Sequence, residues 1–222
     1  MNVLYFLTER LKFIHQFYAT GSAPYLEQKR KIEEGEEPFV PPYNEDGEPP
    51  FLAEWLEADE SLHVLAYTCV SMLAAALHLY FETWVKQCEQ PVSRELKETV
   101  FKKRGWLEGY KAHFEQTLQI NFNEQPVNFR LLEEVILARN LIEHPPSITS
   151  MRTQFADADL KKLRHPFFVD EREAALLTHE GEAWFTSLTL HVSGAQLIEA
   201  VAEIERLASW FEPAIERRLY GQ

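Results

Sequence analysis

The stretch that decides the fold is residues 62–81, LHVLAYTCVSMLAAALHLYF, which carry no charge when the two histidines are neutral. It lies within residues 52–89, which contain no proline or glycine. Twenty such residues reach the length of a membrane span. However, Glu57, Asp59 and Glu60 precede the stretch and no basic cluster flanks it. We therefore expect a central helix over residues 52–89 that a helical bundle buries on most sides, and no membrane contact.

A line of small and polar residues runs along this expected helix at spacings of three and four: Thr68, Ser71, Ala75, His78 and Glu82. Such spacing places the five residues on one helical face. One interpretation is that the small side chains let a neighbouring helix approach while His78 and Glu82 satisfy each other. The other is that this face borders a functional cleft, in which His78 and Glu82 support the site.

Helical periodicity predicts further helices over residues 2–18, with residues 25–34 as a continuation, and over residues 94–119. The helix over residues 94–119 is expected to bend near Gly105 and Gly109. Residues 35–51 are rich in proline and acid, and we expect an extended surface loop there.

Two helix termini are specified by local sequence. Asn128 is suited to cap a helix over residues 129–143, which must stop before the Pro145–Pro146 pair. Ser193 and Gln196 form a capping box at the start of the last helix.

The segment before the last helix has a different pattern. Alternating apolar residues around a Glu-Gly-Glu turn predict a β-hairpin over residues 176–192, within an insertion over residues 166–192. The sequence as a whole predicts a mainly α protein. We expect one domain over residues 1–222, an up-and-down bundle of four to five helices with a small hairpin before the last helix.

The chain of 222 residues is acidic, with 22 Lys and Arg against 35 Asp and Glu and a formal net charge of −13. Its hydrophobic content of 45% fits a soluble globular domain. Cys69 and Cys88 cannot build a disulfide framework and no signal-peptide pattern opens the sequence, so we expect a cytoplasmic protein. The acidic balance argues against coating of nucleic acid by bulk charge, because such binding depends on Lys and Arg.

Common catalytic and cofactor motifs are missing from the sequence. No His or Cys pair has the spacing of a zinc site, and neither a Gly-rich phosphate loop nor a G-x-S-x-G motif occurs. We therefore expect neither a metal nor another cofactor.

Residues 137–144, LARNLIEH, close the helix expected over residues 129–143. Here the sequence resembles the HEPN (higher eukaryote and prokaryote nucleotide-binding) family. Its ribonuclease members carry an Arg, a polar residue, and a His four to six residues beyond the Arg near a helix end. Arg139, Asn140 and His144 match this motif position by position.

The resemblance implies a metal-independent endoribonuclease of a toxin or defence type, which leaves 2′,3′-cyclic phosphate ends. It also implies a homodimer with a composite Arg/His site, and an antitoxin or operon partner. Pro146 stands where some toxin members present a Tyr to a nucleotidyltransferase antitoxin, so the resemblance does not extend to that pairing.

Arg and His also suit this chemistry on physical grounds. Cleavage through a ribose 2′-hydroxyl needs a proton-transfer group, the role of His144, and a fixed cation for charge growing on phosphorus, the role of Arg139. Asn140 would orient the phosphate or the histidine. However, at about 100° per residue Arg139 and His144 stand about 140° apart, and the helix C-terminus repels phosphate. Two copies of the motif across a two-fold axis would supply the missing positive charge.

Three alternatives to a nuclease site remain open for these residues. Arg139 can pair with Glu143 at i+4, which would leave His144 as an ordinary residue at a helix end. A noncatalytic HEPN-like protein would bind a nucleotide or a protein partner through the same cleft. A helical protein of an unrelated family would carry Arg139 and His144 as surface residues.

A local basic run, Lys102, Lys103 and Arg104, separates these alternatives. If the three bases face the site they favour RNA as the ligand. If they lie elsewhere they form only a solvated face.

Overall fold

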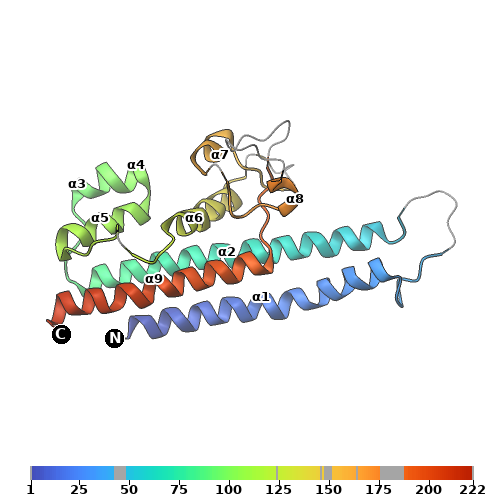
Figure 1. Ribbon diagram of the computed structural model, residues 1–222, viewed down its shortest axis with the longest axis horizontal. Coiled ribbons are helices and arrows are strands. Elements are labelled where there is room, and N and C mark those ends of the chain that lie inside the picture. The colour runs from blue at the N-terminus through green and yellow to red at the C-terminus, as the bar shows by residue number, and fades with distance from the viewer. Residues whose placement is uncertain are drawn as a thin grey trace.

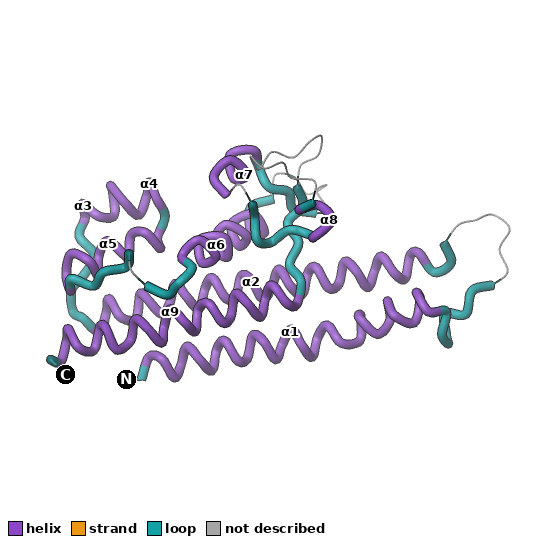
Figure 2. The backbone as a smooth tube through the Cα atoms, viewed as in Figure 1, coloured by secondary structure: helices purple, strands orange, loops and turns teal. Residues whose placement is uncertain are grey.

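The computed structural model describes residues 2–42, 49–123, 125–145, 147, 152–163, 165–175 and 188–221. In this part of the chain the regular structure is helical and no strand occurs (Figure 2). The mainly α class expected from the sequence is therefore confirmed. The helices are α1 (Val3–Glu34), α2 (Leu52–Gln87), α3 (Arg94–Leu96), the π-helical turn η1 (Lys97–Phe101), α4 (Lys102–Arg104), α5 (Trp106–Leu118), α6 (Phe129–Glu143), α7 (Asp157–Leu163), α8 (Glu171–Ala174) and α9 (Gly194–Tyr220).

Three long helices, α1, α2 and α9, lie side by side and form the body of the molecule (Figure 1). The α1 and α2 helices are antiparallel, since Gly21 faces Leu65 and Lys29 pairs with Asp59. The helix α6 packs on α2 and α9, and α5 packs near the C-terminal end of α2. Both chain termini lie at the same end of the body.

The helix α1 extends well beyond residues 2–18, where the helical periodicity of the sequence is clearest. The expected helix over residues 2–18 and its continuation over residues 25–34 are one helix, which passes through Pro24. Gly21 packs against α2 so closely that an added Cβ would lie 3.0 Å from the Leu65 side chain. Gly35, at φ +66°, ends the helix.

The central helix expected over residues 52–89 is present as α2, but it is not buried on most sides, because Val64, Thr68, Ala75 and Leu79 are exposed. Inward-facing residues of α2 such as Cys69, Leu73 and Leu77 are fully buried, and Phe81 joins an aromatic cluster with Phe211 of α9. By length and composition α2 could also cross a membrane, but 50% of its most apolar window is buried against the rest of the protein. Such burial is typical of a core helix.

The segment expected to form one bent helix over residues 94–119 is divided at Gly105. This residue has φ +91°, and it separates α4 from α5. Gly109 has another role, because an added Cβ would lie 2.3 Å from the Phe101 ring. The missing side chain lets α5 and η1 pack closely.

Two helix termini lie where the local sequence predicts them. The Asn128 side chain accepts a hydrogen bond from the Leu131 N–H, and α6 ends at Glu143. Ser193 and Gln196 form the expected capping box of α9.

The expected β-hairpin is not supported. Residues 176–187 lie outside the described residues, and residues 188–192 form no strand. Leu188, Leu190 and Val192 do alternate toward the core, but the backbone of this segment pairs with residues 153–155, where Gln154 and Thr189 form an isolated antiparallel bridge. The alternating apolar residues therefore belong to one buried extended segment, which pairs with an earlier part of the chain and not with a hairpin partner.

Candidate functional site

The motif residues lie together at the C-terminal end of α6. Arg139 donates a 3.0 Å hydrogen bond from Nη1 to Oδ1 of Asn140. Its Nη2 lies 2.5 Å from Oε2 of Glu143. The i,i+4 ion pair expected as an alternative to a nuclease role for Arg139 is therefore present. Both side chains of this pair are solvent-accessible, at 40% for Arg139 and 37% for Glu143.

His144 leaves the helical conformation at φ −128° and ψ 58°. Its backbone N–H donates to the carbonyl oxygen of Asn140 at 3.1 Å. The residue is exposed, and no described group forms a hydrogen bond with its ring. His144 is therefore accessible to a ligand, and helical periodicity does not set the direction of its ring.

His78 of α2 is in electrostatic reach of Arg139. Burial lowers the pKa of His78, the charge of Glu82 opposes that shift, and the charge of Arg139 lowers the pKa further. His78 and Arg139 are thus electrostatic neighbours on facing helices. His78 also lies 3.4 Å from the Tyr110 hydroxyl, and Glu82 pairs with Lys86 at 3.1 Å. Of the two expected supporting residues, His78 is the one whose pKa the charge of Arg139 affects, and its direct contacts are with Tyr110 and Trp106.

Lys102, Lys103 and Arg104 do not gather with the motif. They form α4, which packs against η1 and α5, whereas α6 packs on α2 and α9. Lys102 pairs with Glu98 and Arg104 with Glu108, both within the same part of the chain. This arrangement is that of a solvated, internally neutralised face.

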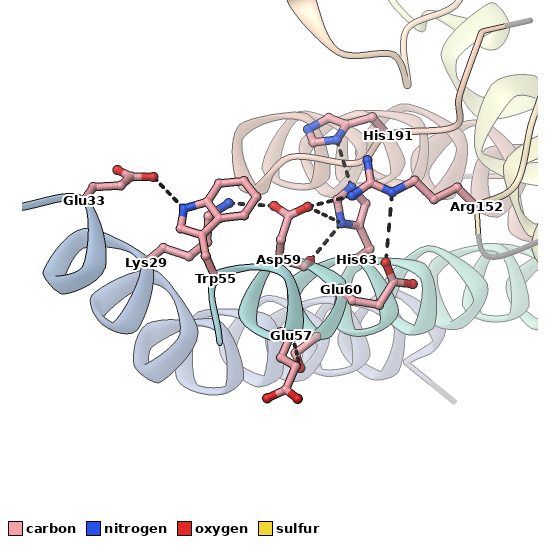
Figure 3. Close-up of polar contacts among 10 residues, drawn as sticks. Lys29, Glu33, Trp55, Glu57, Asp59, Glu60, His63, Arg152 and His191 are labelled. Carbon is pink, nitrogen blue, oxygen red and sulfur yellow. Dashed lines mark hydrogen bonds and ion pairs between the residues drawn. The ribbon is translucent and has the colours of Figure 1, made fainter. Parts of the chain in front are cut away.

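A second polar cluster, which no sequence pattern indicated, surrounds Asp59 near the start of α2 (Figure 3). Its carboxylate accepts from Lys29 of α1 at 2.6 Å and from Arg152 at 2.7 Å. Burial by itself would raise the pKa of Asp59, but the hydrogen bond from Lys29 and the charges of Lys29, His63 and Arg152 lower it overall. We name Lys29, Asp59, His63, Arg152 and His191 the Asp59 cluster.

The two histidines of this cluster are joined ring to ring. Nδ1 of His63 lies 2.8 Å from the carbonyl oxygen of Asp59, and because a carbonyl only accepts, that nitrogen carries a proton. Nε2 of His63 then accepts from Nδ1 of His191 at 3.2 Å when both rings are neutral. Burial lowers the pKa of His191, and the charges of His63 and Arg152 lower it further. The charges of Asp170 and Asp59 oppose this shift.

The Asp59 cluster fastens the segment before α9 to the long helices. Tyr67 of α2 adds a hydrogen bond to the Leu190 carbonyl at 2.6 Å. His63 and His191 lie 128 residues apart in the chain, so no periodicity or local motif could have paired them. Asp59 is one of four acids within residues 52–60, so its place in the sequence did not single it out.

The described residues contain no group of three or more His, Cys, Asp or Glu side chains that could hold a metal ion. Comparison of the chain with known protein families, curated proteins and solved structures gives no match. The resemblance to the HEPN family therefore depends on the motif residues of α6 and the helical architecture alone.

Proposed function

We propose that this chain is a HEPN-like cytoplasmic endoribonuclease of a toxin or defence type, which acts as a homodimer. The observation that carries the proposal is the grouping of Arg139, Asn140 and His144 at one solvent-accessible helix end. Arg139 stabilises the charge that grows on phosphorus, His144 transfers the proton, and Asn140 orients Arg139 or the phosphate. An antitoxin or operon partner would restrain this activity in the cell.

The ion pair between Arg139 and Glu143 is compatible with phosphate binding. An exposed i,i+4 pair contributes only about 0.3–0.5 kcal/mol. A phosphate bound in bidentate fashion to the guanidinium forms a stronger, charge-assisted contact. We expect the incoming phosphate to displace Glu143.

A second copy is needed for electrostatic reasons. The C-terminus of α6 carries partial negative charge, and Glu143 adds a full one, so a single helix end repels phosphate. Two apposed helix ends would contribute two Arg139 and two His144 side chains to one cleft. His78, whose pKa the charge of Arg139 helps to lower, would support the site from α2.

The proposal is tested by incubating a mixed RNA pool with the wild-type protein in excess EDTA and identifying the product ends. We expect 2′,3′-cyclic phosphate, and loss of cleavage in Arg139→Ala and His144→Ala. Arg217→Ala and His15→Ala are matched controls, since both residues are exposed on other helices, and these variants should cleave normally. Cleavage that survives both motif substitutions would reject the assignment.

A noncatalytic HEPN-like module is the second candidate, favoured by the net charge of −13 and by the placement of the α4 bases away from α6. Such a protein would bind a nucleotide or a protein partner through the same helix ends without cutting RNA. The distinguishing result is binding of a fluorescent single-stranded RNA that Arg139→Ala weakens, with no cleavage by the wild-type protein.

A further inference from the structure

Residues 188–192, which lead into α9, are attached to α2 by two side chains of that helix. The Tyr67 hydroxyl donates to the Leu190 carbonyl at 2.6 Å. Nε2 of His63 lies 3.2 Å from Nδ1 of His191 (Figure 3). His63 and Leu190 are both buried, so the attachment covers apolar surface that release of the segment would expose to solvent.

Three backbone amides join this segment to earlier parts of the chain. Leu190 donates to Thr153 at 2.8 Å, Phe155 to Leu188 at 3.0 Å, and His191 to Phe168 at 3.1 Å. A hydrogen-bonded amide exchanges its hydrogen with solvent only when the bond opens. These amides therefore report whether the segment is in place.

The contact between the two rings tolerates one added proton but not two. Nδ1 of His63 donates to the Asp59 carbonyl at 2.8 Å, which leaves Nε2 of His63 to accept from His191. A proton on Nε2 of His63 is accommodated only if His191 is neutral and offers its bare Nδ1 as the acceptor. When both rings are protonated, two N–H groups point at each other across the contact and two positive charges meet.

Charged groups from four parts of the chain face the two rings: Lys29 of α1, Asp59 and Glu60 of α2, Arg152, and Asp170 before α8. The Asp59 carboxylate lies 3.7 Å from Nδ1 of His63, and its charge favours a first proton on the pair. Tyr67 stays neutral, because burial raises its pKa to about 12.

A second proton meets unfavourable surroundings. Lys29 and Arg152 already donate to the Asp59 carboxylate at 2.6 Å and 2.7 Å, so its charge is balanced. Burial lowers the pKa of His191, and the charges of His63 and Arg152 lower it further. The two nearby aspartates oppose this shift without reversing it. The closed pair therefore holds fewer protons than two separated rings hold in water.

We propose that His63 and His191 form a pH-operated latch, in which protonation of both rings at mildly acidic pH releases residues 188–192 from α2 while the long helices stay packed. The latch goes beyond the ribonuclease proposal and does not depend on it. Its release leaves the pair between Asp59 and Lys29 in place, because the lowered pKa of Asp59 keeps that carboxylate charged.

The size of the effect follows from the number of protons bound. A histidine released into solvent, with a pKa of about 6.5, is about 10% protonated at pH 7.5 and about 97% protonated at pH 5. Over this range the opening constant rises about 20-fold if the closed latch holds one proton, and about 1000-fold if it holds none. The latch is thus closed above about pH 6.5 and weakens as the pH falls.

The test is amide hydrogen exchange of the full chain at pH 7.5 and pH 5, followed by NMR and corrected for the intrinsic exchange rate at each pH. We expect the protection of the Leu190 and His191 amides to fall by at least about tenfold at pH 5. Core amides of α2 and α9, such as Leu73 and Ile204, should stay better protected than these two at both pH values, because the release is local.

Amide side chains separate the latch from other histidines. In His191→Asn the new amide can donate to a neutral His63 ring or accept from a protonated one, so protection at Leu190 should change less than about threefold between the two pH values. His63→Gln carries the same prediction from the α2 side. His15→Asn is the matched control, since His15 is exposed on α1, and it should keep the wild-type fall. Circular dichroism verifies that the variants fold.

Three results overturn the latch. The first is wild-type protection at Leu190 and His191 that does not depend on pH. The second is a fall in His191→Asn and His63→Gln as large as in wild type. The third is equal protection of these amides and of the Leu73 and Ile204 amides at pH 5, because the opening would then be global unfolding.

Discussion

Asp59→Asn should destabilise the protein by about 2–3 kcal/mol. The Asp59 carboxylate is only 14% exposed and pairs with Lys29, which is 20% exposed. Breaking a fully buried pair costs about 3–5 kcal/mol, because the remaining charge stays desolvated, and an exposed pair costs about 0–1. The pair between Asp59 and Lys29 is closer to the fully buried case. The Trp55 ring, centred 3.9 Å from the Lys29 ammonium, still stabilises that charge in the variant and offsets part of the loss.

Urea unfolding at pH 7 measures this difference. Arg152→Met serves as the comparison, because Arg152 contacts the same carboxylate but is 46% exposed, and it should cost no more than about 1 kcal/mol. Since the pKa of Asp59 is lowered on folding, its contribution is complete above about pH 4 and is lost as the pH falls through the folded value. Equal losses for Asp59→Asn and Arg152→Met would refute the reasoning from burial.

The remaining predictions concern titration and packing. His78, His113 and His191 each have a lowered pKa through burial, so they are neutral when folded, and the free energy of unfolding should fall as the pH drops below about 6.5. His191→Asn keeps a donor toward His63 and should flatten that dependence, as urea titrations at pH 5 and 7.5 would reveal; an unchanged slope would contradict this. Gly109→Ala should cost about 1–3 kcal/mol, because its Cβ would overlap the Phe101 ring, and a thermal melt equal to wild type would show that the ring moves freely.

Features set by neighbouring residues could be predicted from the sequence. Asn128 caps α6 and the Ser193 capping box opens α9, since each cap involves residues three positions apart. The helix over residues 62–81 followed from their composition, although one face of it is exposed. The grouping of Arg139, Asn140 and His144 also followed, because residues 139–144 span less than about two helical turns.

Features that depend on the tertiary fold could not be predicted. His63 and His191 meet only because the segment before α9 returns to α2. The alternation of Leu188 and Leu190 indicated an extended segment, but periodicity does not say which backbone pairs with it, and residues 153–155 do so. The effect of the Arg139 charge on the pKa of His78 depended in the same way on the packing of α6 against α2.

The α4 bases show how charge patterns mislead. Lys102, Lys103 and Arg104 form the densest basic run near the middle of the sequence, yet Glu98 and Glu108 neutralise two of them one helical turn away. A count of like charges in sequence ignores acids at i−4 and i+4. The ligand-binding role of this run has no support in its contacts.

Subunit mixing tests the composite site most directly. Arg139→Ala and His144→Ala homodimers should each be inactive toward RNA, because one lacks the cation and the other lacks the proton-transfer group. When the two are mixed in equal amounts, about half of the dimers carry one intact Arg139 and one intact His144 across the two-fold axis. We predict that RNA cleavage reappears in the mixture and follows the fraction of mixed dimers. An active wild type with no recovery in the mixture would contradict a shared site, and an inactive wild type would contradict the ribonuclease itself.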